Sequence, residues 1–180
     1  MTPRPLWVFG YGSLLWNPGF EVAETAIATL DGYRRSFCMR SIHHRGTEED
    51  PGLVLALDEM DGANCVGQAL RVSDEMAEAT VAYLRERELI SSAYLEKSLP
   101  VTLGDGRRVE ALAYVIDPEH VQYCGALPLE EQADIIAKAV GGRGPNTEYL
   151  FNTASQLKAL GIEDREMHWL TTQVRLLTER

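Results

Sequence analysis

Two stretches of the sequence carry residue types that could do chemistry: a glycine-rich loop and a run of alternating charges. The loop, Gly10-Tyr11-Gly12-Ser13, directly follows an apolar run. Glycines allow positive φ and a close approach of the backbone to another group. The N–H groups of such a turn can bind a carboxylate or a phosphate. The loop is therefore a candidate anion cradle, and a plain turn or bulge is the alternative.

The loop does not match two familiar glycine motifs. No G-x-G-x-x-G pattern opens a helix at this point, which argues against a dinucleotide-binding fingerprint. Ser13 is followed by Leu14-Leu15 and lacks the second flanking glycine of a nucleophile elbow.

The charged run is Arg85-Glu86-Arg87-Glu88, at the end of a predicted helix. A carboxylate there could act as a general acid and base. Glu86 and Glu88 would point about 200° apart on a helix, so the two cannot serve the same face. An exposed surface rich in salt bridges is the alternative interpretation.

The remaining reactive side chains form no recognisable cluster. His43 and His44 are adjacent, so their side chains point to opposite sides of an extended segment, and a solvated loop is favoured over joint chelation. Cys38, Cys65 and Cys124 are widely spaced, unlike a disulfide framework or a zinc site. No Ser/His/Asp or Cys/His arrangement can be assigned from order alone. We therefore expect no metal site.

Composition limits the class of protein. The 180 residues are 45% hydrophobic, enough for the core of one domain, which we place at residues 1–180. A net charge of −10 argues against nucleic-acid partners and anionic membrane surfaces. Residues 1–5 do not read as a secretory signal, and no apolar segment approaches membrane-spanning length. With three widely spaced cysteines, an odd number, these features favour the cytoplasm.

Hydrophobic patterns predict strands in the first two thirds of the chain and helices in the last third. Asp31-Gly32 and Asp61-Gly62 are interpreted as turns, and Gly104-Asp105-Gly106 as a hairpin turn. The strands are predicted at residues 6–10, 22–30, 33–40, 53–57, 65–72, 94–103 and 108–116.

One helix is predicted among the strands, from Ser73 as its N-cap to Leu89 or Ile90. Three more are predicted at 128–140, at 147–160 with Asn146 as cap, and from about Asp164 to 177. Strands first and helices later indicate the α+β class, with a mixed, mostly antiparallel β-barrel and flanking helices.

Several motifs in this order resemble one known family. They are Trp7–Leu14 with Trp16–Phe20, Gly32–Phe37, His44–Thr47 with Pro51–Leu57, Arg87–Leu89 followed by Tyr94, and Gly142–Leu150. The chain resembles the ChaC-type γ-glutamylcyclotransferases, the glutathione-specific branch of the γ-glutamylcyclotransferase-like fold. The resemblance covers nearly the whole chain and implies a mixed barrel with an active-site cavity at its mouth.

The resemblance also implies site residues. The family's Y-G-S-L loop falls on Tyr11-Gly12-Ser13-Leu14, and this loop with the residues before it would bind the γ-glutamyl head of the substrate. The family's catalytic R-E motif fits Arg85-Glu86 or Arg87-Glu88, and a tyrosine six residues later, Tyr94, selects Glu88. A shorter-spaced branch has its tyrosine four residues on, and this chain departs from it. The substrate-binding candidates are Val8, Phe9, Gly10, Tyr11, Gly12, Ser13, Leu14 and Tyr149.

Tyr149 lies in the family's N-x-E-Y-L motif, where its hydroxyl would reach the substrate; a core aromatic is the alternative. Arg34, Arg40 or Arg45 could meet the glycine carboxylate of glutathione, although a solvated side chain is favoured for each.

The implied reaction is a lyase reaction in which the γ-glutamyl amine of glutathione attacks its own side-chain amide. The products are 5-oxoproline and cysteinylglycine. Glu88, in a partly apolar cavity that raises its affinity for protons, would take the amine proton and return it to the leaving nitrogen. No cofactor is needed, and we expect a monomer or weak dimer. Other γ-glutamyl amides or amines as substrates, a non-catalytic binding module and an interaction protein are the alternatives.

Overall fold

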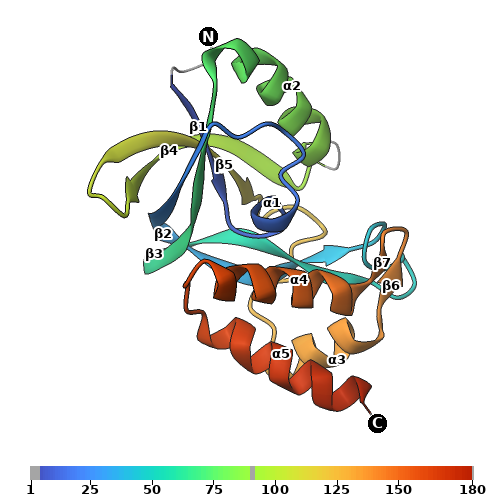
Figure 1. The fold of residues 1–180 in the computed structure, drawn as a ribbon. Helices are drawn as coiled ribbons and strands as arrows, with labels where there is room; N and C mark the ends of the chain where they lie inside the picture. The colour runs from blue at the N-terminus through green and yellow to red at the C-terminus, as the bar shows by residue number, and fades with distance from the viewer. Residues whose placement is uncertain (1–4, 90–91, 180) are drawn as a thin grey trace. The chain divides into compact units, whose positions relative to one another are not determined.

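The computed structural model describes residues 5–89 and 92–179, drawn in Figure 1. The chain divides into two compact units. The first consists of Met1–Arg35 and Leu57–His120, and the second of Ser36–Ala56 and Val121–Arg180. The glycine loop and the charged run both belong to the first unit.

Five strands close into a barrel: β1 (Leu6–Gly10), β2 (Glu24–Ser41), β3 (Gly52–Val72), β4 (Tyr94–Leu103) and β5 (Arg108–Ile116). Their order is β1-β3-β2-β4-β5. β1 pairs antiparallel with β3 and parallel with β5, and β4 pairs antiparallel with both β2 and β5. The predicted α+β fold with a mixed, mostly antiparallel barrel is confirmed.

The predictions of turns at Asp31-Gly32 and Asp61-Gly62 are wrong. Both pairs lie inside the long strands β2 and β3, each of which joins two predicted strands. Gly32 has φ 85° and Gly62 φ 81°. Glycine takes this conformation at little steric cost, so it need not end a strand. The hairpin turn between β4 and β5 is confirmed, with Gly106 at φ 95°.

A helix covers the apolar side of the first unit's strands. It begins with the 3-10 turn η1 (Asp74–Met76) and continues as α2 (Ala77–Glu88). Ser73 is the N-cap residue, as predicted, and its carbonyl accepts from Met76 N–H at 3.0 Å. Its hydroxyl makes no capping hydrogen bond within the described residues. The predicted end at Ile90 lies outside the described residues. The core cluster joins the helix to β1, β3 and β5 through Leu6, Val8, Leu14, Leu70, Val72, Ala77, Val81, Leu84, Leu112 and Tyr114.

The second unit holds three helices that pack on one another, α3 (Leu129–Lys138), α4 (Asn146–Ala159) and α5 (Arg165–Thr178). The short strands β6 (Val140–Gly141) and β7 (Gly144–Pro145) join α3 to α4. α5 begins next to Asp164, as predicted, and the Asp164 side chain caps the helix by accepting from Met167 N–H. Asn146 does not cap α4, because its amide is hydrogen-bonded to both the N–H and the carbonyl of Leu53.

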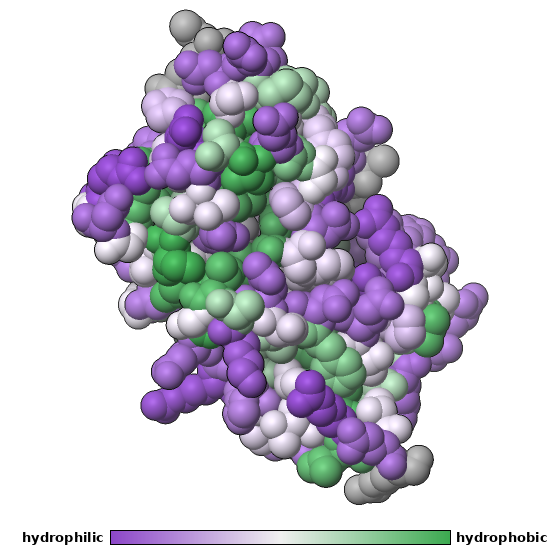
Figure 2. Space-filling model, in the orientation of Figure 1, coloured by the Kyte–Doolittle hydropathy of each residue, from purple (hydrophilic) through white to green (hydrophobic). Residues whose placement is uncertain are grey.

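Hydrophilic residues cover much of the face drawn in Figure 2, with apolar residues visible between them. Large exposed apolar side chains occur on several elements of the described chain, among them Met60, Leu95, Val121 and Leu176. None of the described helices is both long enough and apolar enough to cross a membrane.

Candidate active site

The glycine loop leaves a fully buried strand and enters a short helix. Every residue of β1 is buried, and Gly12 immediately precedes α1 (Ser13–Trp16). The Leu15 N–H donates to the Gly12 carbonyl at 2.9 Å, and the Asn17 N–H donates to the Ser13 carbonyl at 2.7 Å. Loop and helix therefore form one compact turn, in which Ser13 and Trp16 are partly exposed.

Two residues outside the loop hold its backbone. Arg35 is buried in β2 and donates from Nε to the Tyr11 carbonyl at 2.8 Å, while its Nη2 donates to the Val66 carbonyl. Gly67 lies against the loop so closely that an added Cβ would come within 2.3 Å of the Gly10 carbonyl oxygen. β3 can approach the loop this closely only because residue 67 has no side chain.

The Tyr11 side chain points into the barrel wall. Its hydroxyl donates to the Tyr114 carbonyl at 3.2 Å, and the residue is buried. The backbone of Tyr11, rather than its hydroxyl, is therefore the part that lies along the turn.

Glu88 is the last residue of α2, and its side chain is 16% exposed. Its Oε1 lies 3.3 Å from Nε of Arg87. Glu86, by contrast, lies on the exposed side of the helix. The structure therefore separates the two glutamates as helix geometry predicts, and it is Glu88 that is half-enclosed.

Arg87 connects Glu88 with the glycine loop. Its Nη2 donates to Ser13 Oγ at 2.9 Å, and its Nη1 donates to the Asn17 carbonyl at 2.7 Å and to the Pro18 carbonyl at 3.0 Å. The loop and the glutamate that the sequence singled out separately thus meet through one guanidinium group.

A polar chain lies beside this cluster. The Tyr114 hydroxyl donates to Glu96 Oε1 at 2.8 Å, and Arg85 binds both oxygens of Glu96. Burial, and then the hydrogen bond to Glu96, raise the pKa of Tyr114, with a smaller contribution from the charge of Glu88. Tyr114 therefore stays protonated and donates its hydrogen bond to Glu96.

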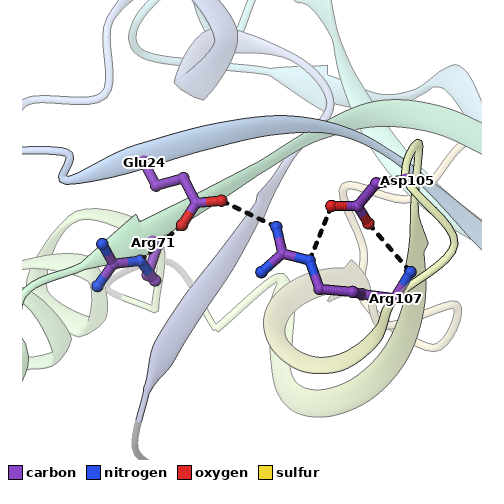
Figure 3. Close-up of polar contacts among 4 residues, drawn as sticks. All are labelled: Glu24, Arg71, Asp105 and Arg107. Carbon is purple, nitrogen blue, oxygen red and sulfur yellow. Dashed lines mark hydrogen bonds and ion pairs between the residues drawn. The ribbon is translucent and has the colours of Figure 1, made fainter.

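Figure 3 shows a second charged network in the same unit, whose side chains are partly exposed. Glu24 bonds Arg107 at 2.9 Å and Arg71 at 3.0 Å, and Arg107 also bonds Asp105 at 2.8 Å. The hydrogen bond from Arg107, followed by that from Arg71, lowers the pKa of Glu24. We assign this network to fixing the β4–β5 hairpin turn rather than to chemistry.

Tyr149 lies in the second unit, with its own set of contacts there. Its hydroxyl accepts a hydrogen bond from Leu55 N–H at 3.1 Å, and its ring meets Phe37 edge to face. These contacts are those of a core aromatic, and a role toward substrate stays a prediction.

The three arginines considered for the glycine carboxylate differ. Arg45 is buried, contrary to the expectation of a solvated side chain, because it donates to the Pro145 carbonyl at 3.0 Å and pairs with Glu148. Arg34 faces Asp58 at 3.8 Å, and the backbone N–H of Arg40 bonds the Gln122 carbonyl.

Sequence reasoning missed Arg35 and Arg87 as parts of the site. The sequence did contain a hint for Arg35: it shares one face of β2 with Tyr33, Phe37 and Met39, and all four residues are buried. Arg87 had none beyond its place next to Glu88, because its partners lie about 70 residues earlier in the chain. In residues 5–89 and 92–179, no three His, Cys, Asp or Glu side chains gather as a metal site would need.

Comparison with known proteins places the chain in a family. A model of the family described as ChaC-like protein matches residues 6–177. The chain belongs to the ChaC-like family. The family match spans both units, and it confirms the resemblance that the motifs indicated.

Named relatives of this ChaC-like chain come from bacteria and animals. It is 39% identical to the glutathione-specific gamma-glutamylcyclotransferase of Escherichia coli (strain K12), over 96% of this chain and 74% of that protein. It is 34% identical to the glutathione-specific gamma-glutamylcyclotransferase 1 of Homo sapiens, over 92% of this chain and 76% of that protein. A crystal structure of a yeast gamma-glutamyl cyclotransferase specific to glutathione superposes with a TM-score of 0.84. That structure is 23% identical and is matched over 96% of this chain and 99% of its own, so it supports the fold.

Proposed function

We propose that this chain is a lyase that cleaves glutathione into 5-oxoproline and cysteinylglycine, with Glu88 as the general acid and base. The bacterial and human relatives named for this reaction are aligned over more than nine tenths of the chain. The observation that carries the proposal within the molecule is that one arginine, Arg87, bonds both Glu88 and Ser13 of the glycine loop.

The chemistry needs one proton carrier. The α-ammonium of the γ-glutamyl unit must lose a proton before its nitrogen can attack the γ-carbonyl carbon. A new C–N bond then closes the five-membered lactam, and the C–N bond to cysteine breaks. The proton that Glu88 removes is returned to the departing cysteine nitrogen, so no water is consumed. Because nucleophile and electrophile belong to one molecule, holding the reactive rotamer supplies much of the rate.

The glycine loop suits the negatively charged parts of this reaction. Backbone N–H groups of residues 10–14 would hold the α-carboxylate or the oxyanion that develops on the γ-carbonyl oxygen. Arg35 Nε donates to the Tyr11 carbonyl and thereby fixes the backbone of the loop. A preorganised loop of this kind needs no rearrangement during the reaction.

Three alternatives remain distinct. Another γ-glutamyl amide or amine would cyclise by the same steps, so a substrate panel separates it from glutathione. A non-catalytic module would bind glutathione without turnover. An interaction protein would bind a partner and do neither. The half-enclosed Glu88 next to the loop favours catalysis over the last two.

We further infer a monomer or weak dimer in the cytoplasm, without a bound cofactor. The three cysteines, Cys38, Cys65 and Cys124, are widely spaced and odd in number, unlike a disulfide framework, which suits a reducing compartment, and glutathione is the thiol buffer of that compartment.

The test is incubation of the purified protein with glutathione in buffer containing a metal chelator, followed by mass spectrometry. Equal amounts of 5-oxoproline and cysteinylglycine are expected. Free glutamate in place of 5-oxoproline would mean hydrolysis by a peptidase and would refute cyclisation. If neither product forms from glutathione but 5-oxoproline forms from another γ-glutamyl amide, the substrate assignment is wrong and the reaction class stands.

A further inference from the structure

Arg87 uses all three guanidinium nitrogens toward the two parts of the candidate site. Nε faces Glu88, Nη2 donates to Ser13 Oγ, and Nη1 donates to two carbonyls of the turn that follows α1. Nη1 also donates to Tyr83 Oη at 3.2 Å. The Arg87 side chain is only 13% exposed. The contacts tie the end of α2 to both ends of α1.

We propose that Arg87 is a positioning residue that fixes the carboxylate of Glu88 relative to the glycine loop. This inference rests on the proposed function, since it concerns the same site. Arg87 bonds protein groups on every side, so its role is to place Glu88 and the loop rather than to bind substrate.

The contacts differ from those of an ordinary surface ion pair. Exposed pairs contribute little because water competes for both charges. Here three of the acceptors are uncharged oxygens, those of Ser13, Asn17 and Pro18. Two different nitrogens of the guanidinium group donate to them, as the forked shape of arginine allows. A lysine at this place would keep the charge, but its single nitrogen could not meet acceptors on both sides of α1.

The turn at Asn17–Gly19 is built to pack against this end of α2. Gly19 has φ 77°, and an added Cβ would lie 2.0 Å from Tyr83 Oη. Tyr83 is one helical turn before Arg87, so both side chains contact the same turn. The chain after α1 is thereby fastened to α2 at two points.

Two effects on catalysis follow. The hydrogen bonds of Nη1 and Nη2 fix the distance between the loop and Glu88, and a displacement of about 1 Å in such a site can lower a rate about 100-fold. The positive charge beside the carboxylate favours its ionised form, the form that accepts the amine proton. The two effects can be separated by substitution.

The experiment compares Arg87→Gln, Arg87→Lys and Ser13→Ala with the wild-type protein, using glutathione turnover over a range of pH. Arg87→Gln loses fork and charge. We expect kcat to fall about 100-fold, and the acid limb of the kcat profile to move about 1 pH unit higher. Arg87→Lys loses only the fork, so kcat falls while the acid limb stays in place. Ser13→Ala, which removes one acceptor, lowers kcat about 10-fold.

Arg71→Gln is the matched control. Arg71 is also in the first unit and also pairs with a glutamate, Glu24, at 3.0 Å, but this pair joins β3 to β2 rather than α2 to the loop. This variant keeps the wild-type kcat and pH profile. Amide hydrogen exchange of residues 13–17 is measured on all variants, and it rises in Arg87→Gln and not in Arg71→Gln.

The outcomes separate the two claims. Wild-type protein that releases no 5-oxoproline refutes the proposed function before any substitution is made. Active wild-type protein with a wild-type pH profile and unchanged exchange in Arg87→Gln overturns the role of Arg87. A lower melting temperature for Arg87→Gln, with kcat per folded molecule and acid limb unchanged, overturns it as well.

Discussion

The Tyr114 hydroxyl donates a hydrogen bond to Glu96 Oε1 at 2.8 Å, inside the polar chain that ends at Arg85. The pair lies on neighbouring strands, directly opposite in the β4–β5 register. The hydrogen bond from Arg85 is the main cause that lowers the pKa of Glu96, and Tyr114 lowers it further against the opposing effect of burial.

The lowered pKa of Glu96 makes the stability of the protein depend on pH in the acidic range. Its folded pKa is below the ordinary 4.5, so the folded protein binds fewer protons than the unfolded chain in acid. The contribution is complete above 4.5 and is lost as the pH falls through the folded value. Glu96→Gln is expected to lose about 1 kcal/mol of unfolding free energy at neutral pH, because Arg85 is largely exposed and screened.

Urea unfolding at neutral pH and at about pH 3 checks this expectation. Glu96→Gln and wild type should converge in acid. Tyr114→Phe, which keeps the ring and removes the hydroxyl, should lose about 1 kcal/mol as well. An equal difference in unfolding free energy between Glu96→Gln and wild type at both pH values would contradict the link between the lowered pKa of Glu96 and stability.

Gly67→Ala is expected to displace the glycine loop. The new methyl group would lie 2.3 Å from the Gly10 carbonyl oxygen and 2.9 Å from the Phe9 ring. Atoms cannot approach this closely, so the backbone at Gly10 or at residue 67 must move. We expect a loss of about 1–3 kcal/mol of stability and a larger relative loss of kcat/KM. Gly104→Ala is the matched control, since its nearest neighbour would be 3.7 Å away. Equal effects of the two substitutions would show that close approach at Gly67 is unimportant.

Arg35→Gln tests the support behind Tyr11. The substitution leaves the carbonyls of Tyr11 and Val66 without their buried donor, and stability should fall by about 2 kcal/mol. The preceding residue, Arg34, supplies the control, because it meets Asp58 only at 3.8 Å. Arg34→Gln should therefore lower the unfolding free energy by less than about 0.5 kcal/mol. Thermal unfolding of both variants gives the comparison. A smaller loss for Arg35→Gln than for Arg34→Gln would refute the assignment.

Asn146→Asp tests the link between α4 and β3 in the second unit. The fully buried Asn146 amide accepts from Leu53 N–H and donates to the Leu53 carbonyl, both at 2.8 Å. A carboxylate cannot donate, so it would face that carbonyl oxygen, and we expect a loss of about 3 kcal/mol at neutral pH that partly recovers in acid. Asn152→Asp, on the exposed side of the same helix, should change stability little. A similar effect at both positions would argue against the Leu53 contact.

The sequence predicted the elements well where hydrophobic period and turn chemistry agreed. β1, the β4–β5 hairpin and the start of α5 near Asp164 follow from local signals alone. Local signals failed at Gly32 and Gly62, where strand pairing on neighbouring elements overrode two strong turn dipeptides. They failed again at Asn146, whose side chain serves Leu53 rather than its own helix.

For the site, the sequence could indicate candidate residues, but it could not show which of them contact one another in the fold. Burial of Glu88 and exposure of Glu86 were unresolved by periodicity, and family spacing decided between them. The roles of Arg35 and Arg87 depend on contacts with residues distant in the chain, which spacing does not reveal.

The measurement that tests the central claim most directly is turnover of glutathione by Glu88→Gln beside Glu86→Gln. Glutamine keeps the shape of residue 88 and removes the proton acceptor. We expect kcat of Glu88→Gln to fall about 100- to 10,000-fold while glutathione still binds, and Glu86→Gln to stay close to wild type. A wild-type rate for Glu88→Gln, with Glu86→Gln inactive, would contradict the account.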